Sequence, residues 1–229
     1  MPEEKKVRGK KQQKKKKNGP KKLEILDACR ELGRACGKVE DFDDVRLYNK
    51  RAKDGYEEQL GRDSEKALDV TRSLIMANMY NGQQIKSVGK KIEKLRDLLK
   101  RMERALGEEN VVTLETLNTL GTKLEQNGEY EEARKVYERC LAGMTEVLGE
   151  DHRVTLMTLN NLGGAYYHLK NYEKALEYFE RALKAKERMF GENYPSTLGT
   201  VANLANIYSF GLKDYGKAEE LYERALEGI

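Results

Sequence analysis

The side chains that most often perform catalysis or bind metal ions are few in this sequence and lie far apart. His152 and His168 are the only histidines among 229 residues, and neither has a Cys, Asp or Glu at metal-ligand spacing on its own helix. No GxGxxG or GxxxxGK[ST] motif is present to hold a nucleotide phosphate. The sequence therefore predicts a protein that is not an enzyme, with no metal site and no cofactor.

The cysteines and the distribution of apolar residues indicate the compartment. Cys29, Cys36 and Cys140 lack CxxC spacing and lie in helical patterns, which is typical of buried free thiols in a reducing environment. No apolar run approaches the roughly 18 residues of a membrane span, and the N-terminus lacks the apolar segment of a signal peptide. We expect a soluble protein of the cytoplasm, or of the nucleus.

One set of amide side chains recurs along the second half of the chain and could bind a peptide. An asparagine amide both donates and accepts hydrogen bonds, so a row of asparagines can bind the backbone of an extended peptide without requiring one particular side chain. An alternative is that Asn160 and Asn203 hydrogen-bond between neighbouring helices. The predicted peptide-binding residues are Asn118, Thr122, Asn160, Asn161, Tyr167, Asn203 and Asn206.

A repeat with a fixed period must position this row. Gly107, Gly149 and Gly191 are separated by two intervals of 42 residues. Each follows Leu or Phe, precedes Glu, and is followed by Thr-Leu six and seven residues later. Self-similarity at such a period indicates stacked supersecondary units rather than one globular core.

Each unit contains two amphipathic helical patterns that a short turn separates. In the first pattern Leu156, Leu159, Leu162 and Tyr166 fall on one stripe, and at 100° per residue the asparagine row lies on the opposite side. Small residues in this helix would let the two helices of a unit approach closely. These small residues are Gly121, Gly163 and Ala205.

The pattern LGxxYxxxxxYxxAxxxFxxAL at residues 162–183 resembles the tetratricopeptide repeat. The usual repeat has about 34 residues, and the longer period, with LGEDH, TL and LNNL, is similar to the 42-residue kinesin light chain type. The resemblance implies an all-α, right-handed superhelical solenoid of about five antiparallel helix pairs. The expected units are residues 21–61, 62–107, 108–149, 150–191 and 192–229.

The resemblance also implies a function, namely a scaffold that binds a peptide or protein partner in the concave groove of the repeats. Members of the family that bind chaperone tails use Lys and Arg on this face to hold a carboxylate. None occurs at the corresponding positions of the last three units, so that ligand is not expected. The N-terminus is rich in lysine where kinesin light chains carry heptads, so the sequence leaves open whether a motor chain is a partner.

The N-terminal segment is strongly basic. Residues 1–22 contain eleven of the 43 Lys and Arg residues but two of the 39 acidic ones. Too few apolar residues are present to offset the entropy of ordering, so we expect residues 1–20 to be disordered. Such a tail is an import signal, a segment that binds nucleic acid or another acidic surface, or a solvated tail. Its central lysines are Lys10, Lys11, Lys14, Lys15, Lys16 and Lys17, and the corresponding alternative function is a nucleic-acid-associated or nuclear adaptor.

The last unit departs from the others in two ways. The interval from Tyr208 to Tyr215 is one residue longer than that from Tyr166 to Tyr172, which predicts a bulged turn. The final helix, predicted over residues 217–226, has no following repeat to cover it. Its apolar side chains are therefore expected to support weak self-association.

Overall fold

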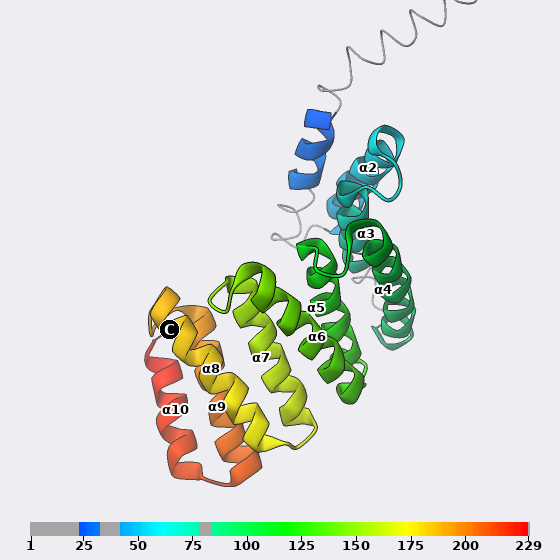
Figure 1. Ribbon diagram of the computed structural model, residues 1–229. Coiled ribbons are helices and arrows are strands. Elements are labelled where there is room, and N and C mark those ends of the chain that lie inside the picture. Colours follow the sequence, from blue (N-terminus) through cyan, green and yellow to red (C-terminus); the bar gives the residue numbers. More distant parts are fainter. Residues whose placement is uncertain (1–22, 33–41, 78–83, 229) are drawn as a thin grey trace, which may run out of the picture. The chain divides into compact units, whose positions relative to one another are not determined.

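The computed structural model describes residues 23–32, 42–77 and 84–228, and within these ranges the regular structure is helical, without strands (Figure 1). The all-α prediction is therefore confirmed. The predicted basic tail, with its lysines, and Cys36 lie outside the described residues. The chain divides into two compact units, Met1–Leu106 and Gly107–Ile229.

In the first unit, a helix over residues 23–32 is followed by three longer helices. These are α2 (Phe42–Leu60), α3 (Glu65–Ala77) and α4 (Gln84–Leu106). Leu26 and Cys29 of the short helix pack with Ala52 and Tyr56 of α2 and with residues of α3 to form a core. The cysteine is a buried free thiol, as the sequence predicts.

The second unit is a stack of helix pairs, and Figure 1 shows its helices lying side by side in chain order. Because each helix packs on the next, every pair covers the apolar face of its neighbour, as expected for stacked repeats. The pairs are α5 (Val111–Gln126) with α6 (Tyr130–Leu148), α7 (Arg153–His168) with α8 (Tyr172–Phe190), and α9 (Pro195–Asn206) with α10 (Tyr215–Glu227).

The glycine that marks the 42-residue period ends the second helix of each repeat. Gly107, Gly149 and Gly191 have φ angles of 94°, 86° and 96°, which a residue with a side chain rarely adopts. The next helix then starts at a cap. Asn110 Oδ1 accepts from the amide of Val112 at 2.9 Å, and His152 Nδ1 accepts from Val154 at 3.3 Å. His152 therefore caps α7.

Glycines in the first helices allow the close approach that the sequence predicts. A methyl group at Gly121 would lie 2.5 Å from the ring of the fully buried Tyr137, and one at Gly163 would lie 3.1 Å from Phe179. The aromatic ring of the second helix thus occupies the space that the missing side chain leaves. This contact sets the spacing between the two helices of a pair.

The extra residue of the last unit does not form a bulged turn, so that prediction is wrong. Instead, Ile207–Leu212 form a π-helical segment, η1, that continues α9 and ends at Lys213 with a left-handed φ of 63°. A π-helical turn accommodates one added residue without breaking the helix. Helix α10 also begins at Tyr215, two residues earlier than predicted.

Lys186 of α8 is a buried cation held by neutral groups. Its side chain is only 7% exposed, and Nζ donates to Ser196 O at 3.0 Å and to Thr200 Oγ1 at 2.7 Å. Burial lowers the pKa of this amine below its ordinary value. The position 42 residues earlier is Met144, so an apolar side chain fits the same place in the repeat.

The glycine contact yields a paired prediction. Gly121→Ala should lower the free energy of unfolding by about 1–3 kcal/mol, because the methyl group collides with Tyr137. The control, Gly199→Ala, lies in the exposed face of α9 with nothing within 4 Å, so it should raise stability by about 0.5–1 kcal/mol. Urea unfolding followed by circular dichroism measures both. Equal effects of the two substitutions would contradict the packing account.

Lys186 yields a prediction about pH. A lysine whose pKa is lower in the folded chain than in the unfolded chain destabilises the fold below the lowered value, and this penalty disappears as the pH rises towards 10.5. Lys186→Met should therefore be at least as stable as the wild type at about pH 7. The free energy of unfolding of the wild type should rise relative to that of the variant as the pH rises to about 10. Urea unfolding at both pH values tests this, and a constant difference between the two proteins would contradict it.

Candidate functional site

A cavity of about 320 Å³ lies over the first helix of each of the last three repeats. We call it the asparagine groove. Residues of α5, α7 and α9 line it, and Phe179 of α8 contributes a buried ring. Its lining residues are Glu125, Asn160, Asn161, Gly164, Tyr167, His168, Phe179, Asn203 and Asn206.

The structure brings five of the seven predicted site residues together in this groove. They are Asn160, Asn161, Tyr167, Asn203 and Asn206. Asn118 and Thr122 do not line the cavity but lie beside it. Asn118 is buried and contacts Asn161, whereas Thr122 Oγ1 donates to Asn118 O at 3.1 Å.

The asparagines form hydrogen bonds from one repeat to the next. Asn161 Nδ2 donates to Asn118 Oδ1 at 3.1 Å, which joins α7 to α5. Asn203 Nδ2 lies 3.5 Å from Asn160 Oδ1 and joins α9 to α7. The inter-helix alternative is therefore observed. An amide has two kinds of hydrogen-bonding group, however, and each of these bonds uses only one of them.

Hydroxyl groups fix which end of two amides is used. Thr200 Oγ1 shares its one proton between Asn160 Oδ1 at 3.0 Å and Ser196 O at 3.1 Å, and Lys186 in turn donates to Thr200. Tyr222 Oη of α10 donates to Asn206 Oδ1 at 2.6 Å. Because these carbonyl oxygens accept bonds from within the protein, the amide nitrogens of Asn160 and Asn206 remain as donors for a ligand.

Aromatic side chains add an apolar wall to the groove. Tyr167 contacts the ring of His168 edge-on at a centroid distance of 5.5 Å. His168 also stacks on Tyr130 at 4.5 Å, which holds the imidazole in place. Neither His168 nor Phe179 is among the site residues that the sequence predicts. The structure places both in the lining of the groove.

Glu125 supplies a negative charge at the end of α5. Its Oε2 accepts from Tyr137 Oη at 3.1 Å, and its Oε1 lies 3.7 Å from His168 Nε2. Burial raises the pKa of this carboxyl above its ordinary value, and the hydrogen bond from Tyr137 opposes the shift. Glu125 is not among the site residues that the sequence predicts.

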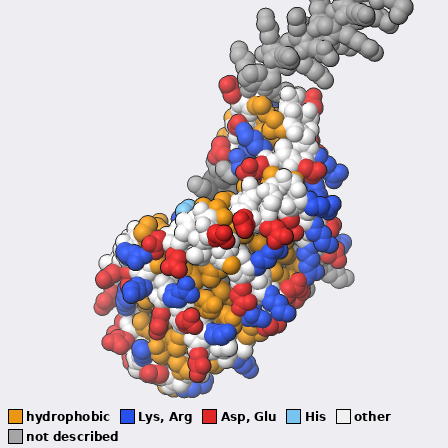
Figure 2. Space-filling model, in the orientation of Figure 1, with side chains coloured by type: hydrophobic (Ala, Val, Ile, Leu, Met, Phe, Trp, Pro, Cys, Tyr) orange, Lys and Arg blue, Asp and Glu red, His pale blue; other side chains and the backbone are white. Residues whose placement is uncertain are grey.

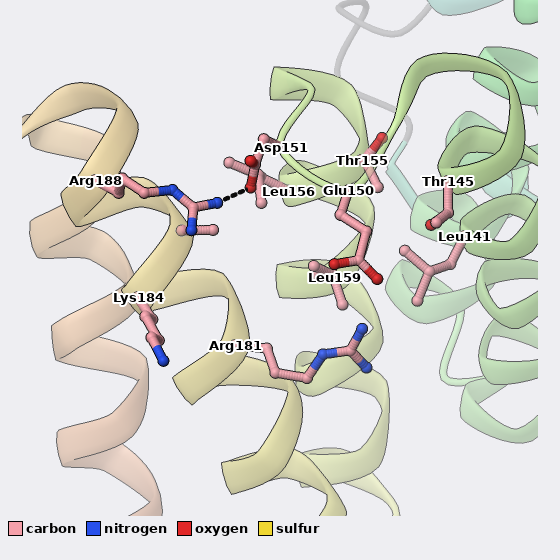
Figure 3. Close-up of a pocket in the computed structure, with 11 residues that line it drawn as sticks. Leu141, Thr145, Glu150, Asp151, Thr155, Leu156, Leu159, Arg181, Lys184 and Arg188 are labelled. Atoms are coloured by element: carbon pink, nitrogen blue, oxygen red, sulfur yellow. Dashed lines mark hydrogen bonds and ion pairs between the residues drawn. The ribbon is translucent and has the colours of Figure 1, made fainter.

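A second cavity, of about 220 Å³, lies where α6, α7 and α8 meet the turn before α7. Figure 3 shows that charged side chains of both signs line it. Arg188 is paired with Asp151, and Arg181 and Glu150 point towards one another. Three cations and two carboxylates line this cavity, but none of the predicted site residues does, so it is a weaker candidate than the asparagine groove.

Outside these cavities, acidic and basic side chains are interspersed over the face seen in Figure 2. This distribution is typical of a solvated helix surface. Over the described ranges we find no group of His, Cys, Asp and Glu that could hold a metal ion. Nor is any helix in those ranges long and apolar enough to cross a bilayer.

Comparison with known proteins supports the repeat assignment. The tetratricopeptide repeat family model matches residues 92–146, 113–188 and 154–228, which together span residues 92–228, more than half of the chain. No curated protein matches the sequence.

Several solved structures share the fold. The nearly identical TPR-like repeats of a Podosopora anserina protein assigned as a kinesin light chain align with a TM-score of 0.71 and 21% identity, over 90% of this chain and 95% of that one. BtubC (BKLC) from P. vanneervenii gives 0.77 and 21%, over 95% and 84%. A Rap protein complexed with Competence and Sporulation Factor gives 0.67 and 17%, over 86% and 51%.

The helix pairs, their 42-residue period and the family match lead to the same assignment. The similarity of the chain to kinesin light chain-like structures fits the long form of the repeat. The chain belongs to the tetratricopeptide repeat family, whose fold is that of a scaffold for protein–protein interaction.

Proposed function

We propose that the chain is a non-enzymatic scaffold that binds an extended peptide segment of a protein partner in the asparagine groove. The observation that carries this proposal is the set of hydrogen bonds among Asn118, Asn161, Asn160 and Asn203, which we call the amide ladder. Hydrogen bonds of Asn161 with Asn118 and of Asn203 with Asn160 join three repeats, and Asn160, Asn161 and Asn203 line a cavity instead of closing it. A surface whose only task was to join helices would not need an open space beside it.

The available hydrogen-bonding groups suit a peptide backbone. Asn160 and Asn206 present amide donors, because their oxygens already accept bonds from Thr200 and Tyr222. Asn161 and Asn203 use their nitrogens within the ladder and so present carbonyl acceptors. A peptide backbone offers one donor and one acceptor at almost every residue, which this alternation can satisfy.

The ladder also lowers the cost of binding. Amides that are already held by neighbouring side chains lose little rotamer freedom when a ligand arrives, so more of the interaction energy appears as affinity. The structure of the Rap protein with Competence and Sporulation Factor supports the proposal in one further respect, because it pairs this fold with a bound factor.

The double variant Asn161→Ala with Asn203→Ala tests the proposal. It removes two carbonyl acceptors from the groove, so a peptide backbone would leave donors unpaired. We expect binding of the tightest decapeptide selected from a random display library on the wild-type chain to weaken by about 1–3 kcal/mol. Isothermal calorimetry at a temperature well below the melting transition measures the loss.

Two controls separate this effect from a loss of stability, because the same substitutions remove two ladder bonds. Asn193→Ala changes an exposed asparagine outside the groove and should leave affinity unchanged. Met144→Leu, in the core of α6, should lower stability by up to about 1.5 kcal/mol with intact affinity. If the double variant melts earlier but binds as tightly as the wild type, the asparagines serve only to join helices.

A further inference from the structure

We propose that the asparagine groove selects a peptide that carries a lysine or arginine, whose cationic side chain pairs with Glu125. This inference rests on the proposed function and specifies its ligand. It concerns the one carboxylate among the residues that line the groove.

The position of Glu125 places its charge inside the groove rather than on the outer surface. It belongs to the last turn of α5, yet its Oε1 reaches α7, since a methyl group built on Gly164 would lie 3.2 Å from that oxygen. The side chain is 23% exposed, so it is largely desolvated but still accessible from the cavity. A carboxylate in this position meets a bound peptide.

The contacts of Glu125 leave one oxygen for a ligand. Oε2 faces Tyr137 Oη at 3.1 Å, and the one proton of this hydroxyl is shared between Oε2 and Thr122 Oγ1, which lies 3.2 Å away. Oε1 receives no hydrogen bond from a described residue, and its nearest basic group is His168 Nε2 at 3.7 Å. That distance exceeds the length of a hydrogen bond. A cation of the ligand would therefore supply the interaction that Oε1 lacks.

Among the lining residues, the one side chain that could compete for Glu125 as a cation is His168, and only when it is protonated. None of the lining residues is Lys or Arg, and the remaining polar groups are asparagine amides, a tyrosine and a histidine. The negative charge of the lining therefore repels acidic peptides and attracts basic ones. The ring of Tyr167, which is half-buried, can also pack on the aliphatic stem of a lysine or arginine.

The partial removal of Glu125 from water also favours a cationic ligand. Burial raises the pKa of Glu125, since a carboxylate that is partly removed from water lacks full compensation for its charge. A ligand cation in the groove would restore that compensation. Charge-assisted hydrogen bonds of this kind are about twice as strong as neutral ones.

A positional-scanning decapeptide library, probed with the full chain, tests this inference. Each pool fixes one position as Lys, Arg, norleucine or Glu, and bound chain is quantified by fluorescence. For the wild type, we expect the best Lys or Arg pool to retain at least about tenfold more chain than the norleucine pool at the same position. The Glu pool should retain the least.

Two variants locate the effect. Glu125→Gln keeps an oxygen that can accept from Tyr137, so it should fold, but it should retain the Lys, Arg and norleucine pools equally. Glu146→Gln removes an equal charge from the exposed surface of α6, outside the groove, and should keep the preference for basic pools.

The outcomes separate this inference from the proposed function. If the wild type retains pools without preferring the basic ones, or if Glu125→Gln keeps the preference, Glu125 does not select the ligand although the groove still binds peptides. Retention of no pool at all would contradict the proposed function itself. Tighter binding of a synthetic peptide of residues 1–22 than of any pool would make the chain's own basic segment the ligand and overturn the assignment to a partner.

Discussion

The contact between a small residue of the first helix and an aromatic ring of the second is the constraint on which this structure depends. Tyr137 fills the space beside Gly121, and Phe179, which lies 42 residues later, does the same at Gly163. The same rings also build the groove. Tyr137 contacts Glu125 through its hydroxyl, whereas Phe179 lines the cavity itself. Close packing of each helix pair and the shape of the binding surface therefore have a common origin.

Consecutive repeats then place groups from distant parts of the sequence side by side. The side-chain hydrogen bonds of Asn161 with Asn118 and of Asn203 with Asn160 both join residues that are 43 positions apart. Because the repeat has a fixed period, one substitution pattern in the first helix generates a continuous polar row. The row lowers the stability of the protein little, since neighbouring amides form hydrogen bonds with each other while a ligand is absent.

Much of the fold could be predicted from the sequence, because spacing alone carries the information. Glycines 42 residues apart mark helix ends, and leucine stripes locate the packed face of each first helix. The same stripes placed the asparagines on the opposite side, and five predicted residues do line one cavity. The π-helical segment Ile207–Leu212 was not predicted, because an added residue in a turn has several backbone solutions of similar energy.

The electrostatic character of the site was harder to predict. Glu125 is one of many acidic residues on these helices, and nothing in its spacing distinguishes it from a solvated one. Its role depends on the reach of its side chain across to Gly164 and on the hydroxyl of Tyr137, which are properties of packing. Nor could the sequence decide between inter-helix bonds and ligand contacts for the asparagines, since one amide can form both.

The central claim is that the asparagine groove binds a peptide, and the side-chain amide resonances of the asparagines test it most directly. With a saturating selected decapeptide, heteronuclear NMR should show shifts of the NH₂ signals of Asn160, Asn161, Asn203 and Asn206. The signal of Asn193, which is exposed outside the groove, should stay in place. Unchanged groove amides, with shifts confined to residues around the second cavity such as Arg181 and Lys184, would contradict the account.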